Sequence, residues 1–126
     1  MRRSHLWLGV VSVVVFVITG QFMRLHEPPM TALSDGVRLM FRSRHIYILA
    51  SGLVNLMLGL YMQRHVAGWR AIVQTVGSGL VTASPVLLVA AFAVEPANGL
   101  QAEMPWSAGG LFALFGGCML HLVCGK

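Results

Sequence analysis

The chain has 126 residues, of which 56% are hydrophobic and only 10% are charged. Soluble domains carry about 25% charged residues, so this composition excludes an ordinary water-soluble domain. The net charge of +5 and the sequence pI of about 10.3 would favour a nucleic-acid partner in a soluble protein. In a membrane chain, basic residues reflect topology instead, and we expect no nucleic-acid partner.

The sequence contains four long stretches without Asp, Glu, Lys or Arg: 6–23, 46–63, 71–94 and 104–125. A helix of about 20 apolar residues crosses the ~30 Å hydrocarbon core of a bilayer, and a span in lipid must satisfy its own backbone hydrogen bonds. We therefore predict an all-α fold, in which the single domain 1–126 is an integral membrane four-helix bundle with antiparallel neighbouring helices and short loops. The expected spans are about 6–25, 38–63, 70–94 and 105–124.

Basic residues are distributed unequally between the two sides that this topology creates. The side with both termini has five of them: Arg2, Arg3, Arg64, Arg70 and Lys126. The other side has four, together with all four acidic residues: Arg24, Arg38, Arg42, Arg44, Glu27, Asp35, Glu95 and Glu103. Because loops rich in Lys and Arg stay in the cytoplasm, we expect both termini on the cytoplasmic side of a bacterial inner membrane.

Polar residues recur every seven positions along the first span: His5, Ser12, Thr19 and His26. Residues seven apart return to nearly the same helix face, so this row should face protein. Interhelical hydrogen bonds explain the two hydroxyls, and solvated positions at the membrane surfaces explain the two histidines. Pro28 and Pro29 end the helix.

A second row lies on one face of the second span: Arg38, Arg42, His45, Leu49, Gly52, Gly59 and Gln63. Spacings of three, four and seven residues place them together. Its glycines either let a neighbouring helix approach or leave room for a flat ligand. Arg44 and Asn55 point away from this face. An amide at mid-membrane needs a partner, so we expect Asn55 to make an interhelical hydrogen bond.

The third span contains Gly77, Ser78 and Gly79 and then Pro85, where a kink is expected. Residues 95–103 are expected to form an outer loop.

In the fourth span, small residues share a face with a histidine and a cysteine: Gly110, Ala113, Gly117, His121 and Cys124. Small residues on a membrane helix indicate close packing. An ionisable residue at the depth of His121 is a functional candidate.

Cys118, His121 and Cys124 follow the spacing C-x-x-H-x-x-C, which offers three metal ligands. They are spread over much of the helix circumference, whereas structural zinc needs four converging ligands, so packing is the favoured explanation. The two cysteines are six residues apart on one helix, too far apart to pair with each other, and we expect free thiols.

Five histidines in a membrane protein with few other polar groups suggest haem b, since imidazole suits iron. Two sites are considered, an outer one at His26, His45, Arg38 and Arg42, with the arginines on the haem propionates, and an inner one at His5 and His121. In outline the expected architecture resembles that of four-helix membrane b-type cytochromes, which carry haem-ligating histidines well inside their helices. Here His5 and His26 are 21 residues apart, about 30 Å of helix, which places them at the membrane surfaces.

Two other functional classes are open. The chain is similar in size to small four-helix multidrug exporters, but those share a membrane-embedded Glu on the first helix. No expected span of this chain contains an acid, so a transporter would have to use His121 instead. The favoured interpretation is an accessory or interaction subunit without catalysis of its own, which binds another membrane protein or a second copy. Its expected helix-packing residues are Gly52, Asn55, Gly59, Gly110 and Gly117.

Overall fold

A computed structural model describes residues 1–63, 67–99, 101 and 103–125 of the chain. Its helices are α1 (Arg2–Leu25), the 3-10 turn η1 (Met30–Ala32), α2 (Asp35–Tyr61), α3 (Trp69–Asn98) and α4 (Pro105–Cys124). No strand occurs in these residues, which confirms the predicted all-α class with four long helices. Arg64 and Lys126, which entered the topology argument, and His65, one of the five histidines, lie outside the described residues.

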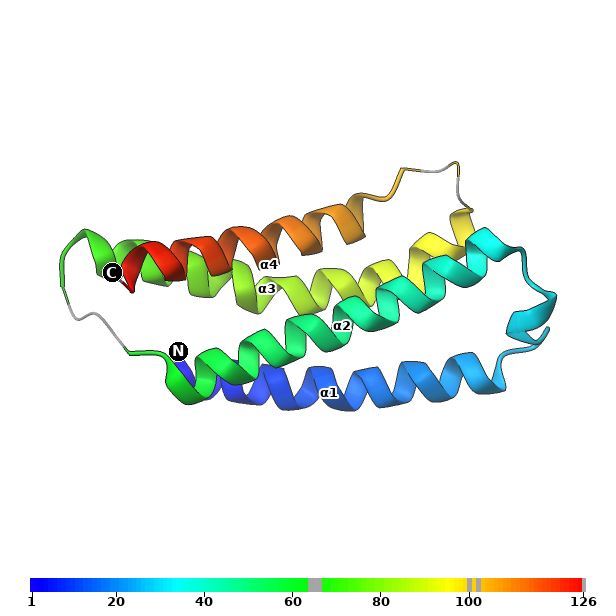
Figure 1. Cartoon of the computed structure of the whole chain (residues 1–126), viewed down its shortest axis with the longest axis horizontal. Helices are drawn as coiled ribbons and strands as arrows, with labels where there is room; N and C mark the ends of the chain where they lie inside the picture. Colours follow the sequence, from blue (N-terminus) through cyan, green and yellow to red (C-terminus); the bar gives the residue numbers. More distant parts are fainter. Residues whose placement is uncertain (64–66, 100, 102, 126) are drawn as a thin grey trace.

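The four long helices run up and down along one long axis, and both chain ends lie at the same end of the molecule (Figure 1). The closest helix pairs are α1 with α2 and α3 with α4, and the two hairpins join mainly through α2 and α3. By contrast, α1 and α3 touch only sparsely. The fold is therefore two hairpins with a lightly packed seam between α1 and α3.

Three helices, α1, α3 and α4, are long and apolar enough to cross a membrane. The prediction of four equivalent spans needs correction, because α2 does not meet this description. Its N-terminal half carries Arg38, Arg42 and Arg44, its C-terminal half carries Asn55, and it ends at Tyr61 rather than at residue 63. α2 is thus the polar member of the bundle.

The boundary of α3 also differs from the prediction. The helix continues past residue 94 to Asn98 and includes both Pro85 and Pro96. The outer loop therefore begins four residues later in the chain than predicted. Glu95, which was placed in that loop, is only 1% exposed. A buried carboxylate needs a partner, and the ion pair described below explains why the helix continues through this position.

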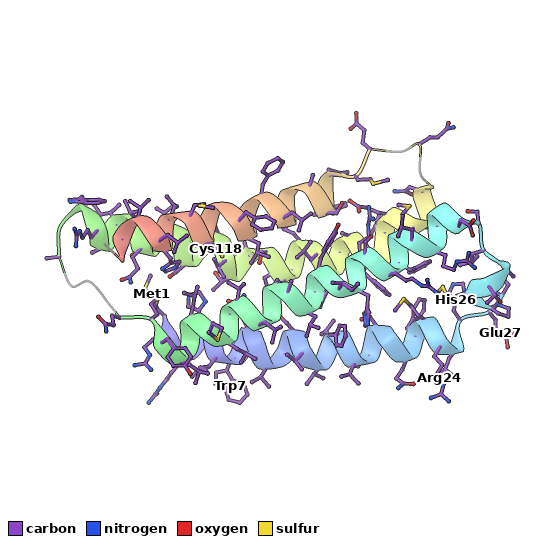
Figure 2. All side chains as sticks on the ribbon, in the orientation of Figure 1. Met1, Trp7, Arg24, His26, Glu27 and Cys118 are labelled. Carbon is purple, nitrogen blue, oxygen red and sulfur yellow. The ribbon has the colours of Figure 1, made fainter. Side chains whose placement is uncertain are left out.

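The outward faces of the helices are apolar. Large hydrophobic side chains lie more than half exposed on every helix, among them Val14, Ile72 and Phe112. Figure 2 shows the Trp7 side chain pointing away from the bundle, where it is 71% exposed. Apolar surface on this scale is rare in soluble monomers and matches a chain surrounded by lipid.

Glycines bring the helices of each hairpin into close contact. A Cβ atom built at Gly52 would lie 2.8 Å from Ser12 Cβ, and one built at Gly59 would lie 2.6 Å from Leu6 Cγ. On the other hairpin, a Cβ at Gly110 would lie 2.7 Å from Leu88 Cγ. These glycine faces are therefore covered by the chain's own helices.

Gly117 and Gly116 provide a matched test of this packing. A Cβ at Gly117 would lie 2.5 Å from Val81 Cγ2 and 2.7 Å from the Gly77 carbonyl oxygen, whereas one at Gly116 would lie 3.9 Å from Leu80 Cδ1. We expect Gly117→Ala to destabilise the fold by about 1–3 kcal/mol and Gly116→Ala to stabilise it by up to about 1 kcal/mol. Unfolding by SDS in mixed micelles measures both, and equal effects would contradict the packing described here.

A buried ion pair ties three helices together at the end of the bundle away from the termini. Arg44 of α2 donates from Nε to Glu95 Oε2 at 3.0 Å, and its second terminal nitrogen lies 2.9 Å from the same oxygen. The Ser107 backbone N–H, in the first turn of α4, donates to Glu95 Oε1 at 2.9 Å. Both carboxylate oxygens are satisfied, so this cluster stabilises the fold rather than offering a free acid.

Removing one partner of this pair should be costly. Arg44→Leu leaves the Glu95 carboxylate buried without its cation, and we expect a loss of about 3–5 kcal/mol. The double variant Arg44→Leu/Glu95→Leu should recover much of that loss. Arg42→Leu is the matched control, because Arg42 is exposed. Equal SDS-unfolding curves for the Arg44 and Arg42 variants would show that the pair contributes nothing.

Candidate functional site

One residue from each long helix meets at the end of the bundle that carries the termini. These are His5 of α1, Asn55 of α2, Ser78 of α3 and His121 of α4, which we term the inner cluster. His5 and Asn55 are fully buried and Ser78 is 4% exposed. The predicted inner pair, His5 and His121, is brought together here, with ring centroids 6.4 Å apart and ring planes at 75°.

Hydrogen bonds fix which nitrogen of His5 carries the proton. The Asn55 amide nitrogen donates to the carbonyl oxygens of Ser51 at 2.9 Å and Val81 at 3.1 Å. The amide oxygen is therefore an acceptor, and it lies 2.8 Å from His5 Nδ1. A neutral imidazole has one N–H, so Nδ1 donates and Nε2 keeps a bare lone pair.

His5 Nε2 is buried and has no hydrogen-bond partner among the described residues. Unsatisfied buried polar atoms are uncommon in folded proteins and call for an explanation. A cavity of about 260 Å³ lies beside this ring, with Ser4, Thr75, Ser78 and Thr82 among its lining residues. The inner cluster thus presents a hydrogen-bond acceptor next to a hydroxyl-lined space.

His121 is held by α3. Its Nε2 lies 3.2 Å from Ser78 Oγ, which itself lies 3.8 Å from the sulfur of Met62. A second cavity of about 370 Å³ is lined by Met62, Gln74, His121 and Cys124, among others. Each histidine of the pair therefore lines a small cavity of its own, His5 the first and His121 the second.

The outer histidines have separate surroundings. His45 stacks on Phe16 with ring centroids 4.0 Å apart and lies 2.8 Å from Thr19 Oγ1. His26 Nδ1 lies 2.8 Å from the carbonyl oxygen of Pro28. Ser12 already occupies the space beside Gly52 that was expected to leave room for a flat ligand.

The two arginines of the predicted outer haem site also have surroundings different from those of its histidines. Arg38 pairs with Asp35 one turn earlier, and Arg42 is exposed. The contacts described for His26 and His45 do not bring the two rings together. They also do not bring Arg38 or Arg42 to either ring. The outer haem site stays a prediction.

Across the described residues, no three His, Cys, Asp or Glu side chains gather in a way that could hold a metal ion. Cys118 and Cys124 are free thiols, as predicted. The Cys124 thiol donates to the carbonyl oxygen of Arg70 at 3.4 Å. The C-x-x-H-x-x-C spacing thus does not form a three-ligand centre.

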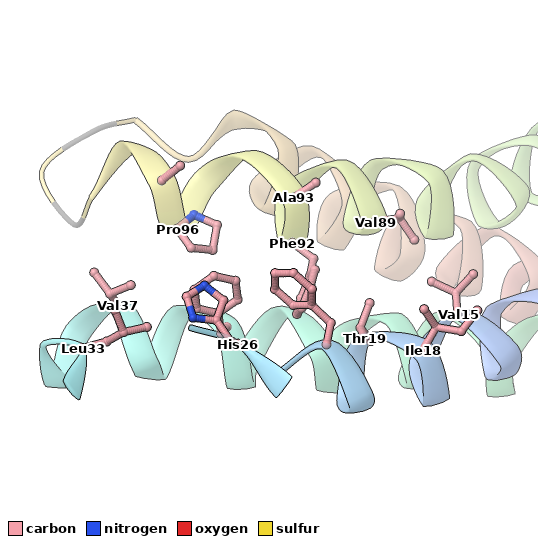
Figure 3. A pocket seen from close by; sticks show the side chains of 13 residues that line it. Val15, Ile18, Thr19, His26, Leu33, Val37, Val89, Phe92, Ala93 and Pro96 are labelled. Carbon is pink, nitrogen blue, oxygen red and sulfur yellow. The ribbon is translucent and has the colours of Figure 1, made fainter. Parts of the chain in front are cut away.

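A feature that the sequence reading missed is an apolar groove along the seam between α1 and α3. It consists of two cavities, of about 670 and 200 Å³, that share Val15 and Val89 as lining residues. Figure 3 shows Val15, Ile18 and Thr19 facing Val89 and Phe92 across the larger cavity. The signal was available in the spacing of the groove face of α1, which follows the three- and four-residue rhythm of a helix: Leu8, Val11, Ser12, Val15, Ile18, Thr19 and Phe22.

Comparisons with protein-family models, with curated proteins and with solved structures give no match to this chain. Its function is therefore argued from the inner cluster and the groove alone.

The proton position on His5 can be measured directly. In protein labelled with ¹⁵N-histidine, we expect the His5 ring to show a protonated Nδ1 and an unprotonated Nε2, because Asn55 accepts from Nδ1. The signal that disappears in His5→Ala identifies the residue. A ring protonated at Nε2 would contradict the hydrogen-bond network of the inner cluster.

Proposed function

We propose that this protein is a small integral membrane protein of the bacterial inner membrane, with both termini in the cytoplasm, that binds an amphiphilic ligand without catalysing a reaction. The apolar outer surface and the three apolar helices support insertion. α2 crosses with them, because its polar face is satisfied inside the bundle, where Arg44 and Asn55 find partners. The bias of basic residues toward the side with the termini supports the orientation.

The observation that carries the proposal is the groove between α1 and α3, made of two adjoining cavities that share Val15 and Val89. Small-molecule sites are concave, mostly apolar and about 300–1,000 Å³ in volume, and the larger cavity, at about 670 Å³, falls in this range. Along α1 the groove extends from Leu8 to Phe22, about 21 Å at 1.5 Å per residue. A space of this shape fits a hydrocarbon chain lying along the helices.

The outer end of the groove supplies polar contacts for a head group. His26 lines the larger cavity, and its Nδ1 donates to the Pro28 carbonyl oxygen, because a carbonyl oxygen only accepts. The neutral ring then offers Nε2 as an acceptor. We infer a ligand with a hydrogen-bond-donating head at the outer membrane surface and a long tail that reaches toward the centre of the bilayer.

The alternatives have less support from the same contacts. The glycine faces expected to bind a partner are covered by the chain's own helices, so an accessory role would have to use another surface. Within the described part of the chain, Glu95 is the buried acid, and Arg44 already neutralises it. A proton-coupled exporter would need a carboxylate that is free to titrate.

Filling the groove tests the proposal. Val15→Trp places an indole at the junction of the two cavities, whereas Val14→Trp, one residue earlier, places the same side chain on the lipid-facing surface, where Val14 is 52% exposed. We expect Val15→Trp to weaken binding of a fluorescent long-chain alcohol by about tenfold. The indole takes the place of part of the buried tail, and losing burial of about two CH₂ groups at ~0.8 kcal/mol each corresponds to about tenfold in affinity.

The assay uses the full chain in nanodiscs, with fluorescence titration of the alcohol, and native mass spectrometry reports amphiphiles that co-purify. Val14→Trp should bind like the unaltered protein. Equal binding by the two tryptophan variants would overturn the groove as the binding site. A co-purifying protein in place of an amphiphile, lost in Val15→Trp, would favour the accessory role.

A further inference from the structure

We propose that His5 and His121 bind a single copper(I) ion, with the sulfur of Met62 as the third ligand. The proposal does not depend on the ligand of the groove, because none of these three residues lines the groove. It starts from the buried lone pair of His5 Nε2, which has no partner among the described residues. A bare imidazole nitrogen can accept a hydrogen bond or bind a metal ion, and the second histidine and the thioether nearby favour the metal.

The separation of the two rings suits a shared ion. Their centroids lie 6.4 Å apart, and a metal–nitrogen bond of about 2.0–2.1 Å on each side, added to the radii of the two rings, spans about this distance when the two nitrogens lie nearly opposite each other across the ion. The thioether then completes the site as a weaker third ligand. His5 has only Nε2 to offer, because Asn55 accepts from Nδ1. Ligation by His121 through Nε2 replaces only its contact with Ser78 Oγ.

Asn55 gives His5 the outer-shell support that metal-binding histidines usually have. Such a histidine donates its second ring N–H to a carboxylate, a carbonyl or a water, which fixes the tautomer and the ring orientation. Here the acceptor is the Asn55 amide oxygen at 2.8 Å, and the amide is itself anchored to the Ser51 and Val81 carbonyls. This arrangement pre-orients a single nitrogen toward a ligand.

The third donor determines which metal the site prefers. Met62 is buried, at 7% exposure, and its sulfur lies 3.8 Å from Ser78 Oγ, the same atom that contacts His121. Thioether sulfur selects copper(I), and imidazole binds copper well. Zinc sites instead favour four converging ligands, and the described residues offer no third His, Cys, Asp or Glu here.

Charge points in the same direction. Two neutral imidazoles and a thioether neutralise none of the ion's charge, and the cost of placing an ion in a low-dielectric interior rises steeply with its charge. A monovalent ion therefore fits this set better than a divalent one. The flanking cavities, of about 260 and 370 Å³, give the ion an approach from the end of the bundle that carries the termini.

The experiment is a competition titration of copper(I) between bicinchoninate and the full chain in nanodiscs under reducing conditions. We expect one ion per chain, with affinity reduced at least ~100-fold in His5→Ala and in His121→Ala, beyond the 10–100-fold typical of outer-shell changes. His26→Ala is the matched control, because His26 lies among Phe22 and Phe41 near the opposite end of α1. It should bind copper(I) within about twofold of the unaltered chain.

A spectroscopic readout keeps the proposal falsifiable if a histidine variant fails to fold. X-ray absorption at the copper edge should show two nitrogen donors and one sulfur donor, and the sulfur should disappear in Met62→Leu, which conserves volume. Unchanged affinity in a folded His5→Ala, no sulfur in the unaltered protein, or tighter binding of Zn²⁺ than of copper(I) would each overturn it. Val15→Trp should bind copper(I) like the unaltered chain. A result that contradicts ligand binding in the groove would therefore not contradict the copper(I) site.

Discussion

The fold depends on pairing the polar side chains that α2 carries into an apolar bundle. Arg44, Ile48, Ser51 and Asn55 follow one another at intervals of four, three and four residues and are all buried. An unpaired charge or amide in such surroundings costs several kcal/mol, so each of these groups needs a partner on another element or on its own helix. Glu95 and the Val81 carbonyl of α3 supply two of them, and this explains why α2 contacts α3 as well as α1.

Composition and hydrophobic periodicity were enough to predict four long helices, because runs without charge leave few alternatives in lipid. Helix ends were harder to predict, and Glu95 shows why. A Glu-Pro pair after an apolar stretch has the local signature of a loop, but the partner that keeps this carboxylate inside α3 lies 51 residues away. No local pattern reports a pairing at that separation.

The same limit applies to the histidines. Their spacing along each helix placed His5 and His121 at one membrane surface, and the fold brings those two rings together. The spacing gave the same reason to pair His26 with His45, but it does not show which side of α1 each ring faces. His45 of α2 contacts Phe16 and Thr19 of α1, whereas His26 contacts Pro28 and lines the groove. Ring orientation is set by helix rotation, which depends on contacts between helices.

The middle of the bundle separates its two ends physically. Ile48, Val81, Leu88 and Ala91 are fully buried, and they lie between the Arg44–Glu95 pair and the inner cluster along α2 and α3. Ser51 and Ser84 lie at this level, but both hydroxyls donate to carbonyl oxygens of their own helices. A path for protons or ions needs polar groups that can exchange partners along its whole length. Such an apolar layer interrupts that path, which argues against conduction through the bundle and agrees with the proposal of two separate binding sites.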